Sequence, residues 1–375
     1  LVPVALSFSV EYGADFSDLF EVRGVKRDTR GRYLEETREG NRICLAYEGL
    51  DGLVRRTTLG FSPLPKSFAS GRATFTQDLR PKEEKEFFLT YACEAGKGGA
   101  AGLSYFAARN RAEEDLKKAQ AQDCQIRTSN ESFNGWLGRS LSDLHMMFTE
   151  TGHGLYPYAG VPWFSAPFGR DGIITALEYL WVNPEVAKGV LRYLSITQAQ
   201  ENDPEKDAEP GKILHEARRG EMASLGEIPF DRYYGSVDAT PLFVILAGAY
   251  LDATDDLAFI RSIWRHIDLA LRWIDEYGDR DGDGFVEYER RSSKGLLHQG
   301  WKDSGDAVFH EDGSPAHGPI ALCEVQGYVY AAKIAGAALA SALGDKQRSA
   351  ALVRQAEILR ENFQNSFWCD EIGTY

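Results

Sequence analysis

The spacing of hydrophobic and polar residues changes early in the chain. Up to about residue 95, apolar and polar positions alternate or form short β-rich runs that Gly, Pro, Asn and Asp interrupt. Runs of this kind predict strands at 4–10, 42–48, 53–61, 72–79 and 84–93. The sequence Ser62-Pro63-Leu64-Pro65 cannot continue a central strand. Several short strands separated by turns are typical of an antiparallel β-sandwich.

From about residue 104 the apolar residues recur at helical spacing instead. Residues 104–122 are rich in Ala, Glu, Arg and Lys, as expected of a solvated linking helix. Apolar periodicity predicts further helices over 133–148, 172–181, 184–199, 237–252, 257–274, 320–343 and 352–367. Because no comparable strand pattern recurs, we expect an all-α second part with long loops, where function usually lies.

These patterns predict two domains joined by a helix. We assign residues 1–100 to a β-sandwich domain, 101–130 to a linker helix and 131–375 to a helical domain. Helix pairs in series predict a toroid, since no fixed-period repeat favours a solenoid. The chain opens directly on a strand pattern and stops without a polar tail, so we expect a fragment of a longer protein, truncated at its N-terminus.

Composition narrows the classes of partner. The formal net charge of −14 disfavours nucleic acid or an anionic membrane and is compatible with a neutral glucan. No apolar run approaches the ~20 residues of a membrane helix, and no signal segment begins the chain. The five cysteines are scattered, odd in number and without a Cys-x-x-Cys pair, which predicts reduced thiols and a cytoplasmic protein.

The segment Gln299-Gly300-Trp301-Lys302-Asp303-Ser304-Gly305-Asp306 carries an aromatic residue and two carboxylates between glycines. An aromatic face stacks on a pyranose, and a shielded carboxylic acid can protonate a glycosidic oxygen. The alternative is a loop Asp that only closes a turn. We select Asp303 as the candidate acid, with Trp301 and Lys302 as candidate sugar contacts.

Polar residues also occur where predicted helices begin. Arg170 and Asp171 can bind sugar hydroxyls as donor and acceptor, although Asp is also a favoured N-cap. Asp238 is either a substrate ligand or a first-turn acid stabilised by the helix dipole. Glu324 lies four residues before Tyr328 on one helical face, either paired in the core or lining a cleft, and we favour the cleft.

Two segments match metal motifs incompletely. His215-Glu216 begins like a His-Glu-x-x-His zinc motif, but Arg219 replaces the second histidine, so sugar contacts or a structural ion pair are better interpretations. Residues 279–287 have the Asp-x-Asp-x-Asp-Gly spacing of a calcium loop, yet Arg290 stands where an EF-hand needs a bidentate Glu. A degenerate calcium site stays open, while an acidic turn closed by Asx hydrogen bonds is favoured. We predict no metal and no cofactor.

Six segments together form a specific combination: Pro162-Trp163-Phe164-Ser165, Phe168-Gly169-Arg170-Asp171-Gly172, the run from Asp207 to Glu216, Tyr234-Gly235-Ser236-Val237-Asp238-Ala239-Thr240, Gln299-Gly300-Trp301-Lys302-Asp303-Ser304 and Cys323-Glu324-Val325-Gln326-Gly327-Tyr328. In this order they resemble the amylo-α-1,6-glucosidase or glycogen-debranching family of bacterial type, over nearly the whole chain. The family is similar to the clan of inverting glycosidases built on an (α/α)6 barrel. The resemblance implies an N-terminal β-sandwich followed by an (α/α)6 toroid.

The resemblance also implies roles for single residues. Asp303 matches the clan's general acid, kept protonated by partial desolvation. Arg170 and Asp171 match residues that hold the sugar in the subsite being cleaved, which Trp301 and Glu324 would line. The remaining candidate sugar contacts are Trp163, His215, Glu216, Asp238 and Lys302. The expected reaction is hydrolysis of α-glucosidic linkages, with α-1,6 branches of a glycogen-like glucan as substrate and inversion of configuration.

The match to a complete barrel is partial. About eight helices are predicted after residue 104, whereas six pairs need twelve, so we expect an incomplete toroid in this chain. The general base of related glycosidases is a Glu nearer the C-terminal side, and we expect it beyond Tyr375. Two alternatives stay open: a glycosidase of the same clan with another oligosaccharide substrate, and a non-catalytic glycan-binding protein.

Overall fold

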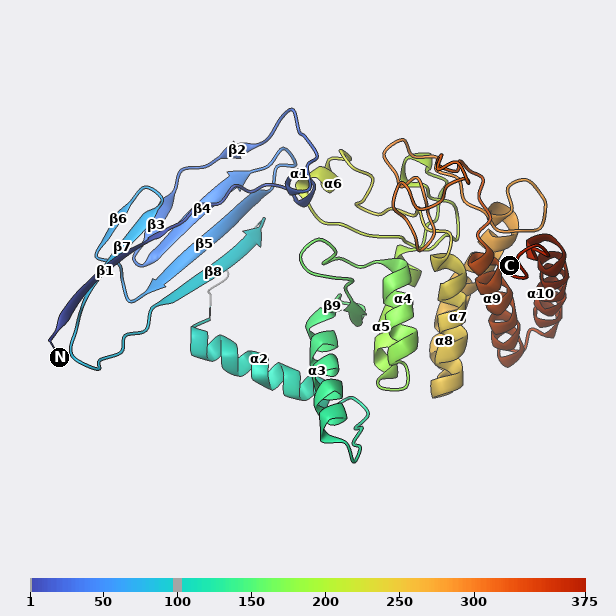
Figure 1. Ribbon diagram of the computed structural model, residues 1–375, viewed down its shortest axis with the longest axis horizontal. Helices are drawn as coiled ribbons and strands as arrows, with labels where there is room; N and C mark the ends of the chain where they lie inside the picture. Colours follow the sequence, from blue (N-terminus) through green and yellow to red (C-terminus); the bar gives the residue numbers. More distant parts are fainter. Residues whose placement is uncertain (1, 97–102) are drawn as a thin grey trace. The chain divides into compact units, whose positions relative to one another are not determined.

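The computed structural model describes residues 2–96 and 103–375 (Figure 1). The chain divides into two compact units. The first comprises Leu1–Lys118 and Gly220–Leu225, and the second comprises Ala119–Arg219 and Gly226–Tyr375. The predicted strand start at Leu1 and the predicted boundary between residues 100 and 101 lie outside the described residues.

The first unit contains two antiparallel sheets. In the smaller sheet the strand order is β1 (Val4–Glu11), β7 (Arg72–Leu79), β6 (Ser67–Ala69). In the larger sheet it is β2 (Arg32–Tyr33), β4 (Arg42–Glu48), β5 (Val54–Ser62), β8 (Phe88–Ala95), with β3 (Thr37–Glu39) also paired with β4. The strand positions predicted from alternating apolar residues are therefore confirmed, apart from the short strands β2, β3 and β6.

The two sheets share one apolar core, which makes the unit a sandwich. Ile43 on β4 and Leu59 and Phe61 on β5 are buried with Phe75 on β7. The rings of Phe61 and Phe75, which come from different sheets, have centroids 6.0 Å apart. Alternate residues of each strand point to this core because successive side chains of a strand face opposite sides. The helices α1 (Leu19–Val22) and α2 (Tyr105–Gln120) complete the region, and α2 buries no residue, as a solvated helix should.

The second unit is helical. Its longer helices are α3 (Glu131–Met147), α4 (Gly169–Tyr179), α5 (Pro184–Thr197), α7 (Ala239–Thr254), α8 (Leu257–Trp273), α9 (Cys323–Ala342) and α10 (Lys346–Phe367). Shorter pieces are a 3-10 turn at Pro204–Lys206, α6 (Glu221–Ser224, part of the first unit) and a π-turn at Ile274–Gly278. The fold prediction is confirmed: sheets come first and helices follow.

One detail of the all-α prediction is wrong. Phe148–Glu150 and Leu155–Pro157 form a small antiparallel hairpin, β9 and β10. Gly152 and Gly154 between them have φ values of +79° and +116°, which glycine adopts without steric cost. The strands are too short for an alternating pattern to reveal them.

Three helical hairpins pack beside one another in the described part of the second unit: α4 with α5, α7 with α8, and α9 with α10 (Figure 1). Neighbouring hairpins meet mainly through α7, which packs against both α4 and α5 of one hairpin and against α9 of the other. Helix α7 lies in the middle and is apolar nearly all round, with buried Leu242, Phe243, Leu246 and Tyr250. No described helix combines the length and apolar character that crossing a membrane requires.

The segments that connect the helices differ in length, and the long ones lie at one end of the helices. Turns within the hairpins are short, at 180–183, 255–256 and 343–345, whereas the segments 198–238 and 279–322 between hairpins are long. Each hairpin reverses direction, so both long segments begin and end at the same end of the helices (Figure 1). The first turns of α4, α7 and α9 lie at this end as well.

Candidate active site

The guanidinium of Arg170 joins three segments that are far apart in the sequence. One nitrogen, Nη1, donates to Oδ2 of Asp238 at 3.1 Å and to the carbonyl of Gly300 at 2.9 Å. The other, Nη2, donates to Oδ2 of Asp303 at 3.2 Å. Asp238 is 68 residues from Arg170, and Asp303 is 133 residues away. Residues 299–306, here called the acid-bearing loop, are thus held by Arg170 at two points.

Asp238 is a buried partner of Arg170. Its carboxylate is almost fully buried, and Oδ1 accepts a 2.6 Å hydrogen bond from the hydroxyl of Ser236. Asp238 is the N-cap of α7, but its side chain makes no capping hydrogen bond. The carboxylate therefore serves Arg170 and Ser236 rather than the helix end. A direct contact of Asp238 with sugar stays a prediction.

Asp171 follows Arg170 in the first turn of α4. The N-cap of that helix is Phe168, so the capping interpretation of Asp171 does not hold. Burial raises the pKa of the Asp171 carboxyl, Arg170 opposes that rise, and the charges of Asp303 and Asp238 add to it. Asp171 is thus a third carboxyl group near this arginine, and burial disfavours its ionised form.

Glu324 and Tyr328 on α9 lie near Arg170 and Asp238. The helix begins at Cys323, which places Glu324 in its first turn and Tyr328 one turn later, as their spacing predicts. Burial raises the pKa of Tyr328, the charges of Asp238 and Glu324 raise it further, and Arg170 lowers it. Glu324 is half-buried rather than enclosed in the core. That Glu324 lines a sugar-binding cleft stays a prediction, and its half-buried position is compatible with that role.

Two tryptophans offer exposed rings. Trp301, in the acid-bearing loop, is 57% exposed, and Trp163 is 40% exposed. The ammonium of Lys302 lies 5.2 Å from the centroid of the Trp301 ring. An exposed indole face can stack on a sugar ring, and that role is a prediction for both residues.

His215 and Glu216 are buried, at 3% and 5% exposure. Burial lowers the pKa of His215 to about 3, with smaller contributions from Arg170, Arg218 and Lys212. The carboxylate of Glu216 accepts a 2.5 Å hydrogen bond from Nε of Arg218, and Arg218 also donates to the carbonyl of Trp163 at 2.6 Å. This geometry supports the ion-pair interpretation of Glu216. The imidazole is neutral above about pH 4 because low-dielectric surroundings disfavour its charge.

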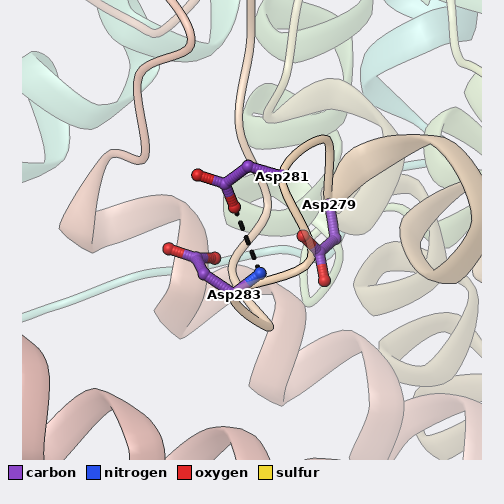
Figure 2. A group of neighbouring side chains, drawn as sticks. All are labelled: Asp279, Asp281 and Asp283. Carbon is purple, nitrogen blue, oxygen red and sulfur yellow. Dashed lines mark hydrogen bonds between the residues drawn. The ribbon is translucent and has the colours of Figure 1, made fainter.

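The acidic turn at 279–287, which precedes the acid-bearing loop in the sequence, is closed by local hydrogen bonds. Carboxylate oxygens of Asp279, Asp281 and Asp283 lie within 4.8 Å of one another, the one such group of possible metal ligands among the described residues (Figure 2). Asp279 accepts from the backbone N–H groups of Gly282 and Gly284, at 2.7 and 3.0 Å. Asp281 accepts from the N–H of Asp283 at 3.1 Å. These are the Asx hydrogen bonds expected of an acidic turn.

Sequence reasoning assigned no role to three groups that the structure places at or beside the site. They are the carbonyl of Gly300, the hydroxyl of Ser236 and the buried carboxylate of Asp207. A backbone carbonyl carries no sequence signal. Ser236 and Asp207 stand in polar segments without periodicity, so no pattern shows that they are buried.

The second unit thus gathers carboxylates and an arginine at one end of its helical hairpins. Residues 1–90 match the family of the N-terminal domain of (some) glycogen debranching enzymes. The predicted resemblance to the glycogen-debranching family is confirmed over these residues, a segment that contributed none of the motifs from 162–328.

Two solved structures were compared with this chain, and the first shares its fold. A protein assigned as a kojibiose phosphorylase, from the human microbiome, has a TM-score of 0.55 and 12% identity over 99% of this chain and 51% of its own. This chain thus spans about half of that protein, and at this identity the likeness concerns the fold. The GH78 family rhamnosidase of Bacillus sp. GL1 has a TM-score of 0.47 and 13% identity over 91% of this chain and 33% of its own. No curated protein matches the chain.

Proposed function

We propose that this chain carries the general acid and the sugar-holding residues of an inverting glycosidase that hydrolyses α-glucosidic linkages, with α-1,6 branches of glycogen-like glucans as substrate. The observation that supports this most is the joining of Asp238, Gly300 and Asp303 by Arg170. A general acid must be held at a defined distance from the bond it protonates. One partly buried arginine that binds both the loop and its acid meets that need.

Asp303 is the proposed acid because it combines fixation with access. Its Oδ2 is bound to Arg170, whereas its Oδ1 has no hydrogen-bond partner among the described residues. The side chain is 37% exposed, so a glycosidic oxygen can reach it. We propose that Asp303 gives its proton to the leaving oxygen while water attacks the opposite face of the sugar.

The neighbouring groups suit a bound sugar ring. Arg170 can donate to hydroxyls, Asp171 and Glu324 can accept from them, and the exposed face of Trp301 can stack on the ring. An inverting reaction also needs a base, about 6.5–9.5 Å from the acid, to activate water. The family resemblance implies a glutamate in that role. The proposal makes no use of a metal or cofactor.

Phosphorolysis is the second candidate function, because the fold relative named above is assigned as a phosphorylase. In an inverting phosphorolysis, inorganic phosphate replaces water as the nucleophile. Asp303 would keep its role as acid, so its position does not separate the two reactions.

A product assay with the full-length protein separates the candidates. Branched limit dextrin, isomaltose, trehalose and sucrose are incubated with and without inorganic phosphate, and the products and their anomers are followed by NMR. We expect β-glucose from limit dextrin, independent of phosphate. A sugar phosphate among the products would favour phosphorolysis. Glucose released from another of the substrates would indicate a different specificity. Glucan binding without any product would favour a non-catalytic binding protein.

A further inference from the structure

A second buried carboxylate, that of Asp207, binds the segment that leads into the acid-bearing loop. Asp207 is 1% exposed. Its Oδ1 accepts from the backbone N–H groups of Arg291 and Ser292, at 2.7 and 3.1 Å. Its Oδ2 accepts from the hydroxyl of Tyr233 at 2.7 Å and from Nε2 of Gln299 at 3.2 Å. The carboxylate thus connects three separate parts of the chain through four neutral donors.

Gln299 passes this connection to the loop that carries Asp303. Its side chain is buried at 1% exposure, and its carbonyl accepts from the N–H of Val237 at 2.9 Å. The next carbonyl, that of Gly300, accepts from Arg170. Two consecutive residues at the start of the loop are therefore fixed, one by Asp207 and Val237 and the other by Arg170.

The backbone around Asp207 is specialised for this arrangement. Asp207 has φ = +50°, a left-handed conformation that non-glycine residues rarely adopt. Such a conformation costs on the order of 1 kcal/mol and persists where surrounding bonds compensate for it. Gly295 passes so close that an added Cβ would collide with the hydroxyl of Tyr233 and lie 2.8 Å from Oδ2 of Asp207.

We infer that Asp207 is a positioning residue for the general acid and acts on it through Gln299. The inference rests on the proposed function of Asp303, which it deepens. A displacement of about 1 Å at a reacting group can cost about 10²-fold in rate. Asp207 does not reach the acid itself, so its effect must pass through the position of the loop.

The variant Asp207→Asn tests the connection, because an amide nitrogen in place of Oδ2 would face the amide donor of Gln299. Glu209→Gln is the matched control. Glu209 lies two residues away, is also buried, and accepts from Trp273 at 2.8 Å and Arg280 at 2.9 Å. Its carboxylate also lies 3.6 Å from the guanidinium of Arg291, and none of these side chains belongs to residues 299–306. The double variant Asp207→Asn/Gln299→Glu exchanges amide and carboxylate at constant net charge.

Two measurements separate positioning from stability, both made well below the melting temperature. The first compares kcat on branched dextrin with kcat on α-glucosyl fluoride, whose leaving group needs no proton. We expect Asp207→Asn to lower kcat on dextrin about 10²-fold, with KM nearly unchanged and the fluoride affected less than about 3-fold. Glu209→Gln should not change the ratio of the two rates, and the double variant should recover part of it.

The second measurement is hydrogen exchange of the amides in residues 296–303. Faster exchange in Asp207→Asn than in Glu209→Gln supports the inference and does not depend on any activity. Equal exchange in the two variants, or equal losses on dextrin and fluoride, would overturn it. A wild-type protein that cleaves neither substrate would refute the proposed function, and hydrogen exchange alone would then decide whether Asp207 positions the loop.

Discussion

Two acidic loops lie between the π-turn after α8 and the start of α9, and they are held in opposite ways. In the turn at 279–287, each Asp accepts from backbone N–H groups only a few residues away. In the acid-bearing loop, Asp303 and Gly300 are bound by an arginine 133 and 130 residues distant. The aspartates of the first loop are thus bound by near neighbours in the chain, although Arg280 and Val286 of that loop also bind Glu209 and Gln326. The acid of the second loop is bound across the packed hairpins.

This difference separates structure from proposed chemistry. In the turn, each aspartate gives at least one carboxylate oxygen to a backbone N–H group nearby in the sequence. A loop held from outside can leave one carboxylate oxygen uncovered, as Oδ1 of Asp303 is among the described residues. Substitutions in the acid-bearing loop and its supports should therefore change activity, and substitutions in the turn should change only stability.

The largest effect is expected for Asp303→Asn. The amide keeps the shape of the side chain but has no proton to donate, so kcat on branched dextrin should fall about 10²–10⁴-fold. The loss should be much smaller on α-glucosyl fluoride, and glucan affinity should remain. Asp306→Asn, an exposed acid of the same loop, is the control. An inactive Asp306→Asn beside an active Asp303→Asn would show that the acid is assigned to the wrong residue.

The next effect concerns the external support. Arg170→Lys keeps the positive charge, but one ammonium group cannot span Asp238, Gly300 and Asp303 as the planar guanidinium does. We expect kcat to fall by roughly 10–100-fold, because the loop loses its fixed position. Arg272→Lys is the control, since Arg272 forms an exposed pair with Glu276. Equal activity of wild type and Arg170→Lys would contradict the importance of this support.

A smaller effect, on stability rather than rate, is expected at His215. Its pKa is about 3 in the folded protein and near 6.5 when unfolded, so between these values the unfolded state binds more protons. Stability should therefore fall as the pH drops from about 6.5 toward 3. At pH 5 the protonation of His215 in the unfolded state should lower the free energy of unfolding by on the order of 2 kcal/mol relative to neutral pH.

The variant His215→Gln isolates this term. Thermal unfolding of the variant should depend less on pH between 7 and 5 than that of the wild type. If both proteins lose the same stability over this range, burial does not keep the imidazole of His215 neutral.

The smallest effect is expected in the acidic turn at 279–287. Burial raises the pKa of Glu287, and the charges of Asp281, Asp283 and Asp279 add to this, against a backbone hydrogen bond that lowers it. The folded state therefore binds more protons than the unfolded state just above pH 4.5, and stability falls as the pH rises through the folded pKa. Glu287→Gln should stabilise the protein modestly at pH 7 and not below about pH 4, without changing activity.

The same variant tests the calcium alternative. Thermal melts with chelator and with added calcium are compared for wild type and Glu287→Gln. We expect calcium to have little effect on either. A calcium-dependent rise in the melting temperature of the wild type, lost in Glu287→Gln, would show that the turn is a metal site after all.

The sequence by itself determined the elements of this fold and several members of the site. Strands and helices were predictable because alternation and helical periodicity are local consequences of which face of each element is buried. Arg170, Asp303 and Glu324 were predicted as site residues because polar residues interrupt those patterns. The short hairpin β9–β10 escaped because three residues do not make a pattern.

Only the tertiary structure decided which of these polar groups meet. That Arg170 reaches Asp238, Gly300 and Asp303 follows from hairpins whose long connections share one end, which no local pattern encodes. Burial is likewise a property of the packed fold. It sets the pKa of His215, makes Glu216 a partner of Arg218, and turns Asp207 from one loop acid among many into the support of a loop 92 residues away.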